Sequence, residues 1–382
     1  MEAYFDNSAT TKVLDSVKDI VVKTMTEDYG NASAKHRMGM EAENYIKEAR
    51  SIIAQNLKVQ EKEIIFTSGG SESNNMALIG TAQAYRRSGN HIISSNIEHA
   101  SVYNPLGYLE EQGFEITFLP VDSQGHINLD ELKEAIRPDT ILVSVMYVNN
   151  EVGAVEPVEE ISKVIKTKNP DTLFHVDAIQ AYGKFQIRPK RQGIDLMSVS
   201  GHKIHGPKGV GFLYVDQQVK IKPLIYGGGQ QRGMRAGTEN VPGVAGLGAA
   251  VKEIYTNHQE KMDKLYELKD YMTGRLQELE GVYINSRPGR ESAPQIVSAS
   301  FEGVRSEVLL HSLEERGIYV SSGSACSSRH PGVSGTLKGI GVRQDLLDAT
   351  LRFSFGIFNT REEVDYAVDV LKELLPVLRR YK

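Results

Sequence analysis

The sequence predicts an α/β fold in which a large domain, with a mostly parallel sheet between helices, is joined to a smaller α+β domain. Short runs rich in β-branched residues alternate with longer segments whose apolar residues recur about every 3.6 positions. Parallel neighbours in a sheet need a helical crossover, so this alternation favours a parallel sheet. The alternation stops near residue 280, and 382 residues are enough for two domains of roughly 100–200 residues each.

The expected strands of the large domain are short apolar runs that end in polar or glycine-rich sequence. They are Glu63–Thr67, His91–Ser95, Glu115–Leu119, Thr140–Val145, Thr172–Val176, Asp195–Val199 and Val210–Val215. Segments with helical spacing lie between most of them, and these are Ser71–Tyr85, Ser101–Gln112, Leu129–Ile136 and Val158–Thr167. Ligands of such sheets bind beyond the carboxyl ends of the strands, where the polar clusters fall.

A long, mostly helical stretch from about Val241 to Leu279 is the predicted connection between the domains. The smaller domain is then expected to contain strand Gln295–Phe301, helix Ser306–Glu315, strand Ile318–Ser321, strand Leu351–Phe355 and a final helix Arg361–Tyr381. We expect the large domain to span residues 16–262, and the small domain to combine residues 1–15 with residues 263–382.

Composition excludes several classes of protein. The 44 basic and 49 acidic residues give a net charge of −5, which offers no general reason to expect nucleic acid as a ligand. No window approaches 18 consecutive apolar residues, and the N-terminus lacks the pattern of a secretory signal. Cys326 is the only cysteine, so an internal disulfide is impossible. We predict a cytoplasmic protein without a membrane or nucleic-acid partner.

Residues 67–73, Thr-Ser-Gly-Gly-Ser-Glu-Ser, follow a predicted strand and open a predicted helix. Free backbone N–H groups and the helix dipole favour an anion there, and glycine lets the backbone come close to a phosphate. An N-capped helix after a tight turn is an equally good interpretation of this segment alone. The chain has neither G-x-G-x-x-G nor G-x-x-x-x-G-K-[ST], so dinucleotide and P-loop sites lack their main support.

Asp177 ends an apolar strand, where a carboxylate needs a partner or a task. Lys203 follows in the polar segment Ser-Gly-His-Lys-Ile-His-Gly-Pro-Lys-Gly, and a lysine there could form a Schiff base if its pKa were lowered. A solvated surface charge is the plainer interpretation of a single lysine. A metal site built from Asp177, His175, His202 and His205 is disfavoured, because the spacing matches no zinc signature; no metal is predicted.

Three further clusters are rich in polar residues and glycine. Residues 147–153 follow a predicted strand, and residues 227–238 combine glycines with Arg232 and Arg235. The segment Ser-Ser-Gly-Ser-Ala-Cys-Ser-Ser-Arg-His contains Cys326, with Arg329 and His330 close by. Nearby positive charge favours a thiolate, so we interpret Cys326 as reactive and not as a buried structural cysteine.

Taken together, these clusters resemble the cysteine desulfurases, which are pyridoxal-phosphate enzymes of the class V aminotransferase family. The resemblance runs from Tyr-Phe-Asp-Asn-Ser-Ala-Thr-Thr at residues 4–11 to Arg-Phe-Ser-Phe-Gly at residues 352–356. The segments around Lys203 and Cys326 are its most specific parts. The resemblance implies the fold type I of pyridoxal-phosphate-dependent transferases and a reaction that converts L-cysteine to L-alanine, with the sulfur passing to a persulfide on the enzyme.

The resemblance also implies roles for single residues. Lys203 would bind the cofactor and move protons at the substrate Cα, and Cys326 would be the nucleophile. Asp177 would pair with the ring nitrogen, Gln180 with the phenolic oxygen, and His99 would stack on the ring face. The residues that would hold the phosphate are Gly70, Ser71, Ser200, His202 and, from the other subunit, Thr238. The residues that would bind the substrate carboxylate are Asn150 and Arg352.

A residue shared across subunits implies a homodimer. The persulfide sulfur would pass to an acceptor protein, either a scaffold for iron–sulfur cluster assembly or an enzyme of a thiolation pathway, and the sequence does not choose between them. Selenocysteine lyase, or another pyridoxal-phosphate-dependent lyase, is the alternative activity. It would use the same cofactor site but would depend less on Cys326.

Overall fold

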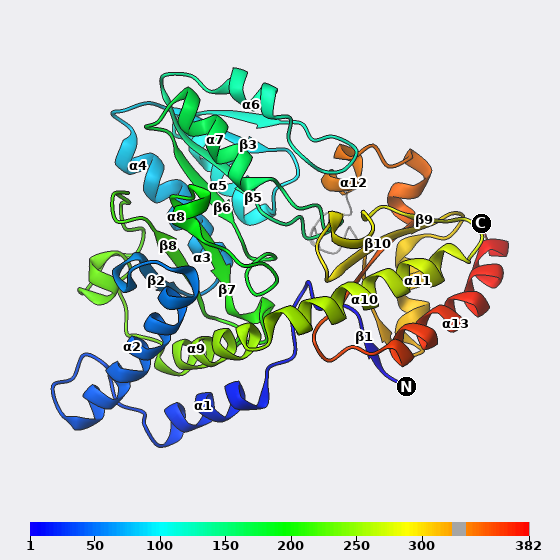
Figure 1. The fold of residues 1–382 in the computed structure, drawn as a ribbon, viewed down its shortest axis with the longest axis horizontal. Coiled ribbons are helices and arrows are strands. Elements are labelled where there is room, and N and C mark those ends of the chain that lie inside the picture. The colour runs from blue at the N-terminus through cyan, green and yellow to red at the C-terminus, as the bar shows by residue number, and fades with distance from the viewer. Residues whose placement is uncertain (323–333, 382) are drawn as a thin grey trace.

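The structure, a computed structural model, describes residues 1–322 and 334–381, and its centre is a seven-stranded sheet. The strand order is β2-β8-β7-β6-β5-β3-β4 (Figure 1). The bounds are β2 (Ile64–Thr67), β3 (His91–Ser95), β4 (Glu115–Leu119), β5 (Thr140–Met146), β6 (Leu173–Asp177), β7 (Leu196–Ser200) and β8 (Gly211–Val215). Strands β3 to β7 pair in parallel, whereas β8 runs antiparallel to β7 and β2. The predicted α/β class with a mostly parallel sheet is confirmed.

Helices cover both faces of this sheet. Along β8, Phe212 and Tyr214 enter one apolar core, and Leu213 and Val215 enter another. Successive side chains of a strand point to opposite faces, so two separate cores require cover on both sides. One face packs against α2 (Arg37–Leu57), α7 (Val158–Lys168) and α9 (Val241–Tyr255), and the other against α3 (Gly70–Asn75) and α5 (Ala100–Glu111).

Two long helices before the first predicted strand were not predicted. These are α1 (Asp15–Thr26) and α2, and both pack against α9. In α2 the buried residues Ala42, Ile46, Ala49 and Ile53 recur every three or four positions, which is the spacing of an amphipathic helix. The signal was therefore present in the sequence. The remaining helices of this part are α4 (Thr81–Tyr85), α6 (Leu129–Ala135) and α8 (Pro189–Gln192).

The predicted helical connection consists of two helices. α9 ends at Tyr255, and α10 (His258–Gln277) begins after Asn257, whose φ of 51° lies in the left-handed region. Asparagine tolerates that region better than most residues, so the break falls where the backbone can turn most easily. α9 packs in the core of the large sheet, whereas Met262 and Leu265 of α10 pack in a separate core.

That separate core belongs to the smaller α+β part of the chain. Its four-stranded antiparallel sheet has the order β12-β13-β10-β9. The bounds are β9 (Val282–Ile284), β10 (Ile296–Phe301), β12 (Ser321–Ser322) and β13 (Thr350–Ser354), with helices α11 (Ser306–Glu314), α12 (Gly335–Gly339) and α13 (Arg361–Leu378). The predicted strand at Ile318–Ser321 is two short strands, β12 and β11 (Ile318–Tyr319).

The N-terminal residues join this smaller part. β1 (Ala3–Tyr4) pairs in parallel with β11, and Phe5 is fully buried among Phe353 and Phe355. The boundaries predicted at residues 15/16 and 262/263 stay a prediction. None of the described helices is both long and apolar enough to cross a membrane.

Candidate active site

A cavity of about 390 Å³ lies at the carboxyl ends of the parallel strands, between the two parts of the chain. Most of the predicted site residues line it, although they come from separate elements. They are Gly70, Ser71, His99, Asn150, Asp177, Gln180, Ser200, His202, Lys203 and Arg352. Asp6, Ser8, Ser101 and Ser321 line it as well. This is the edge at which open α/β sheets bind their ligands.

Asp177 is the last residue of β6, and it is only 5% exposed. Its carboxylate accepts hydrogen bonds from Nδ2 of Asn74 at 2.8 Å and from the backbone N–H of Ile179 at 3.0 Å. Burial raises the pKa of Asp177, while these two hydrogen bonds and the nearby His99 and Lys203 act in the opposite direction. A buried carboxylate in this environment is suited to pairing with a positively charged ring nitrogen.

Lys203 ends a single 3₁₀ turn (Gly201–Lys203) directly after β7. Its Nζ donates hydrogen bonds to the backbone carbonyls of Ser8 at 2.6 Å and Ala9 at 2.8 Å. Its own carbonyl accepts a hydrogen bond from Nζ of Lys184 at 2.6 Å, and burial lowers the pKa of Lys184 to about 7. Lys203 is therefore held inside the cavity and is not a solvated surface charge.

His99 stands at the start of α5 and caps it. Its Nδ1 accepts a hydrogen bond from the backbone N–H of Ser101 at 3.1 Å and lies 2.8 Å from Oγ of Ser101. Burial lowers the pKa of His99, so the ring is neutral near pH 7. A neutral aromatic ring with its edge fixed by a helix cap can lie against a flat ligand.

Four of the residues predicted to hold the phosphate lie close together where α3 begins. They are Gly70, Ser71, Ser200 and His202. Gly69, directly before α3, has a φ of +146°, a conformation that a side chain would strain. A Cβ on Gly70 would lie 2.2 Å from Cδ1 of Ile179, so a larger residue there would require the Ile179 side chain to move. Burial lowers the pKa of His202 to about 4, which leaves a neutral imidazole facing the same region.

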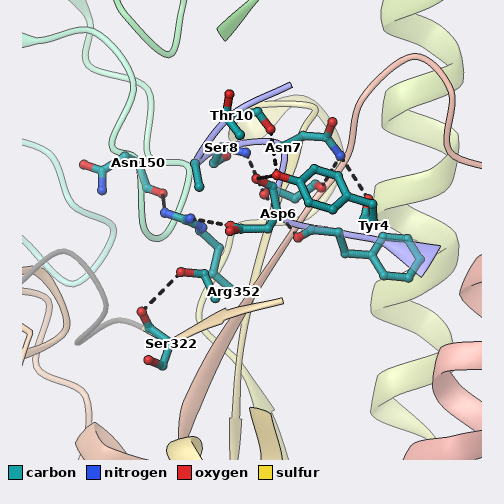
Figure 2. Close-up of polar contacts among 12 residues, drawn as sticks. Tyr4, Asp6, Asn7, Ser8, Thr10, Asn150, Ser322 and Arg352 are labelled. Carbon is teal, nitrogen blue, oxygen red and sulfur yellow. Dashed lines mark hydrogen bonds and ion pairs between the residues drawn. The ribbon is translucent and has the colours of Figure 1, made fainter. Parts of the chain in front are cut away.

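Arg352, on β13, is 6% exposed and reaches the cavity from the smaller part of the chain. Its Nη2 lies 2.9 Å from Oδ1 of Asp6, and its Nη1 donates to the backbone carbonyl of Asn150 at 2.8 Å (Figure 2). Nε of Arg352 is buried and makes no hydrogen bond within the described residues. Nη1 and Nη2 each carry a second hydrogen, so the guanidinium is fixed in place with donor capacity left for a ligand.

Gln180 is held next to the same N-terminal segment. Its Nε2 donates to the carbonyl of Ser8 at 3.0 Å, and its own backbone carbonyl accepts from Nε2 of Gln295 at 3.0 Å. Gln180 is 7% exposed. One hydrogen of its amide therefore remains for a ligand oxygen in the cavity.

Of the predicted residues that the structure describes, only Thr238 does not line the cavity. Thr238 is exposed, in the segment before α9. Cys326 lies outside the described residues, although Ser321 of β12, five positions before it in the sequence, lines the cavity. Within residues 1–322 and 334–381, no three His, Cys, Asp or Glu side chains have the geometry to hold a metal ion.

Several residues of the site were not predicted from the sequence. Asp6 orients Arg352, and Asn74 contacts Asp177. A sequence signal existed for Asn74, because it lies four positions after Gly70 on the same helix and therefore on the same face. No local signal existed for Asp6, since its partner is 346 positions away.

Comparison with known proteins identifies the family of the chain. The family Aminotransferase class-V matches residues 3–367. Cysteine desulfurase IscS of Dictyoglomus turgidum is 42% identical over 379 residues, which cover 99% of this chain and 95% of that protein. A solved NifS-like protein shares the fold with a TM-score of 0.94 at 39% identity, covering 99% of this chain and 100% of that one. SspA, solved in complex with cysteine, has a TM-score of 0.82 at 35% identity, covering 94% and 100%.

The family match spans nearly the whole chain, and the identity to the relatives extends over both parts of it. The chain therefore belongs to the class-V aminotransferase family and, within it, to the pyridoxal-phosphate-dependent cysteine desulfurases.

Proposed function

We propose that this protein converts L-cysteine to L-alanine and passes the sulfur, by way of a persulfide on Cys326, to an acceptor protein. One observation carries the proposal: Asp177, Lys203 and Arg352 line a single cavity. An acid to hold a ring proton, an amine to move a substrate proton and a guanidinium to bind a carboxylate are what the reaction requires. The relatives named above support cysteine as the substrate.

The residues present fit pyridoxal phosphate. Gly69 and Gly70 open a backbone cradle next to Ser200, and the φ of +146° at Gly69 is one that a side chain would strain. Asp177 supplies a buried carboxylate on one side of the cavity, and Lys203 supplies an amine. The donor set therefore provides for the phosphate, the ring nitrogen and the aldehyde of this cofactor.

When bound, pyridoxal phosphate supplies an electron sink that stabilises negative charge at the substrate Cα. Asp177 would keep a proton on the ring nitrogen, and His99 would cover one face of the ring. Gln180 would donate its remaining amide hydrogen to the phenolic oxygen. The phosphate would be held by Gly70, Ser71, Ser200 and His202.

The substrate carboxylate would bind to Arg352 and Asn150. Arg352 is already oriented by Asp6 and by the carbonyl of Asn150, so little side-chain freedom is lost on binding. A guanidinium can donate two parallel hydrogen bonds to a carboxylate, which fixes the orientation of the substrate as well as its position.

The chemistry then needs two groups of the chain. Lys203 would take the proton from the substrate Cα. The thiolate of Cys326 would attack the substrate sulfur, so that an S–S bond forms as the C–S bond breaks. The carbon fragment keeps the electron pair of the C–S bond, takes up protons and leaves as alanine. Cys326 retains the transferred sulfur as a persulfide.

The direct test uses the purified protein with L-cysteine and no reductant. We expect alanine to form in a single turnover and the peptide that contains Cys326 to gain the mass of one sulfur atom. Alanine without a modified Cys326 would replace the persulfide mechanism with a lyase mechanism. If neither alanine nor the modified peptide forms, the proposed function is contradicted.

Replacing Arg352 with Lys should raise the KM for L-cysteine. A lysine ammonium cannot form the paired hydrogen bonds of a guanidinium, and the loss of a hydrogen bond to a charged group corresponds to about a 10- to 100-fold effect. Steady-state kinetics would measure it, and the visible absorption of bound cofactor should stay unchanged. Arg343→Lys is the matched control, because Arg343 forms exposed ion pairs with Glu302 and Asp345. An unchanged KM in Arg352→Lys would contradict this role.

We propose that the protein is a homodimer in which Thr238 completes the phosphate site of the partner subunit. Thr238 is exposed, and Ile225 and Tyr226 near the start of the same loop are 42% and 78% exposed. In that loop Gln231 and Arg232 have φ values of 45° and 58°. Exposed apolar residues and backbone strain in one loop support an interface there.

Mixing Lys203→Ala subunits with Thr238→Ala subunits tests this sharing. A hybrid dimer would have one site with both substitutions and one site with neither, so activity should rise above that of either parent. Native mass spectrometry would verify that hybrids form. Hybrids without recovered activity would show that each subunit uses its own Thr238.

The acceptor of the sulfur is proposed to be a protein, either an iron–sulfur scaffold or an enzyme of a thiolation pathway. The prediction of a cytoplasmic location stays a prediction.

A further inference from the structure

Asn74 joins the two residues that are expected to contact the cofactor ring. It lies in α3, is 0% exposed and was not part of the predicted site. Its Nδ2 donates one hydrogen bond to Oδ2 of Asp177 at 2.8 Å and another to Oγ of Ser101 at 2.9 Å. Ser101 in turn contacts His99. One buried amide therefore connects three elements of the site: α3, β6 and the start of α5.

The orientation of this amide is determined by its neighbours. An amide NH₂ group has two hydrogens, and both are used. The Oδ1 atom of Asn74 is buried and accepts no hydrogen bond from the described residues. Exchanging the amide oxygen and nitrogen would place that oxygen against the Asp177 carboxylate. Asn74 is therefore a donor to Asp177 and to Ser101.

Ser101, which accepts a hydrogen bond from Asn74, also places the proton on His99. The backbone N–H of Ser101 donates to Nδ1 of His99 at 3.1 Å, so Nδ1 carries no proton. Oγ of Ser101 accepts from Asn74 and gives its own hydrogen to the same Nδ1 at 2.8 Å. The proton of the neutral imidazole must then be on Nε2.

The charge on Asp177 depends on the same amide. Burial raises the pKa of Asp177, and burial likewise raises the pKa of the neighbouring Glu98 to about 8. Four groups lower the pKa of Asp177 against this effect of burial. They are the hydrogen bonds from Ile179 and Asn74 and the nearby His99 and Lys203. Of these groups, Asn74 is the one whose side chain donates a hydrogen bond to the carboxylate of Asp177.

We propose that Asn74 is a positioning residue that holds Asp177 ionised and orients the hydroxyl of Ser101 beside His99. The proposal rests on the proposed function, because Asp177 and His99 act on the ring of the cofactor. Without Asn74, Asp177 would keep its own proton in a larger fraction of molecules and would hold the ring nitrogen less well. The backbone N–H of Ser101 would still donate to Nδ1 of His99, so the tautomer of His99 would not change.

The test compares Asn74→Ala, Asn74→Asp and wild type, with pyridoxal 5′-phosphate added to each apo protein. Removing a donor from a buried charged group should raise the Kd for the cofactor about 10-fold or more in Asn74→Ala. Asn74→Asp should raise the Kd most at high pH, where the new carboxyl loses its proton and repels Asp177. The pH dependence of the visible absorption should shift in both variants. Nitrogen NMR of labelled histidine, assigned from a His99→Ala sample, should still show the Nε2-protonated form of His99, because the backbone N–H of Ser101 keeps donating to Nδ1.

Asn75→Ala is the matched control. Asn75 is the next residue of the same helix, and its Nδ2 donates to the carbonyl of Ser71 at an exposed position. It should keep the wild-type absorption profile and His99 tautomer. The melting temperature of each apo protein reports whether it is folded. If Asn74→Ala does not fold, the nearly isosteric Asn74→Asp is used to test the proposal.

Wild-type affinity and absorption profile in the Asn74 variants would overturn the proposal, as would equal changes in Asn75→Ala. Failure of the wild-type protein to bind the cofactor would instead overturn the proposed function.

Discussion

Replacing Lys203 with Ala should abolish the release of alanine from L-cysteine, with a loss of about 10³-fold or more. Proton transfer by a positioned side chain contributes roughly 10²–10⁴-fold, and the same amine is also the proposed attachment point of the cofactor. The structure holds this amine in the cavity, against the carbonyls of Ser8 and Ala9. Alanine formation measures the loss, and the substitution should remove selenocysteine turnover as well.

Chemical labelling tests the same assignment independently of rate. Borohydride reduction of the wild-type holoenzyme, followed by peptide mapping, should place the pyridoxyl group on Lys203. Lys208→Ala is the control, because Lys208 lies in the same motif but is exposed. That variant should keep the label on Lys203. A label on Lys208 of the wild type, or no label at all, would show that Lys203 is not the attachment site.

Cys326→Ser should lower the release of alanine from L-cysteine by at least about 10²-fold when no external thiol is present. A serine hydroxyl is a far weaker nucleophile toward sulfur than a thiolate, and Cys326 is the only cysteine of the chain. Its task begins after the substrate has bound and lost its Cα proton. Cofactor binding, and the spectral change on adding cysteine, should therefore stay close to those of the wild type.

Selenocysteine provides the contrast for this variant. Its selenium can leave without attack by a protein thiol, so Cys326→Ser should keep much of that activity while Lys203→Ala loses it. Comparing the two substrates in the two variants separates cofactor chemistry from sulfur transfer. Turnover of L-cysteine by Cys326→Ser at nearly the wild-type rate would favour the lyase alternative.

Much of the central sheet was predictable because its pattern is local. Buried strands such as β5 and β6 consist of continuous apolar runs, and the helices between them show the spacing of about 3.6 residues. The helix break at Asn257 was not predicted, because both sides of it have helical apolar spacing. A left-handed residue at that point directs α10 into a different core from α9.

The site, like the fold, was only partly predictable from the sequence. Asp177 and Lys203 follow neighbouring parallel strands, and such strand ends must meet at one edge of the sheet, so their proximity followed from the predicted fold. Their roles, and that of Cys326, came from the resemblance of whole motifs. Neither spacing nor composition distinguishes an attachment lysine from an exposed one.

The sequence by itself determined the α/β class and the strand ends at which the site lies, and it offers a single cysteine as the proposed nucleophile. Only the tertiary structure decided which groups orient the reacting ones. Asp6 reaches Arg352 across 346 positions because the N-terminal segment lies beside β13, and Asn74 reaches Asp177 because α3 turns one face toward β6. Hydrogen bonds act over about 3 Å. Such contacts are set by packing between distant segments, and a local pattern of residues does not encode them.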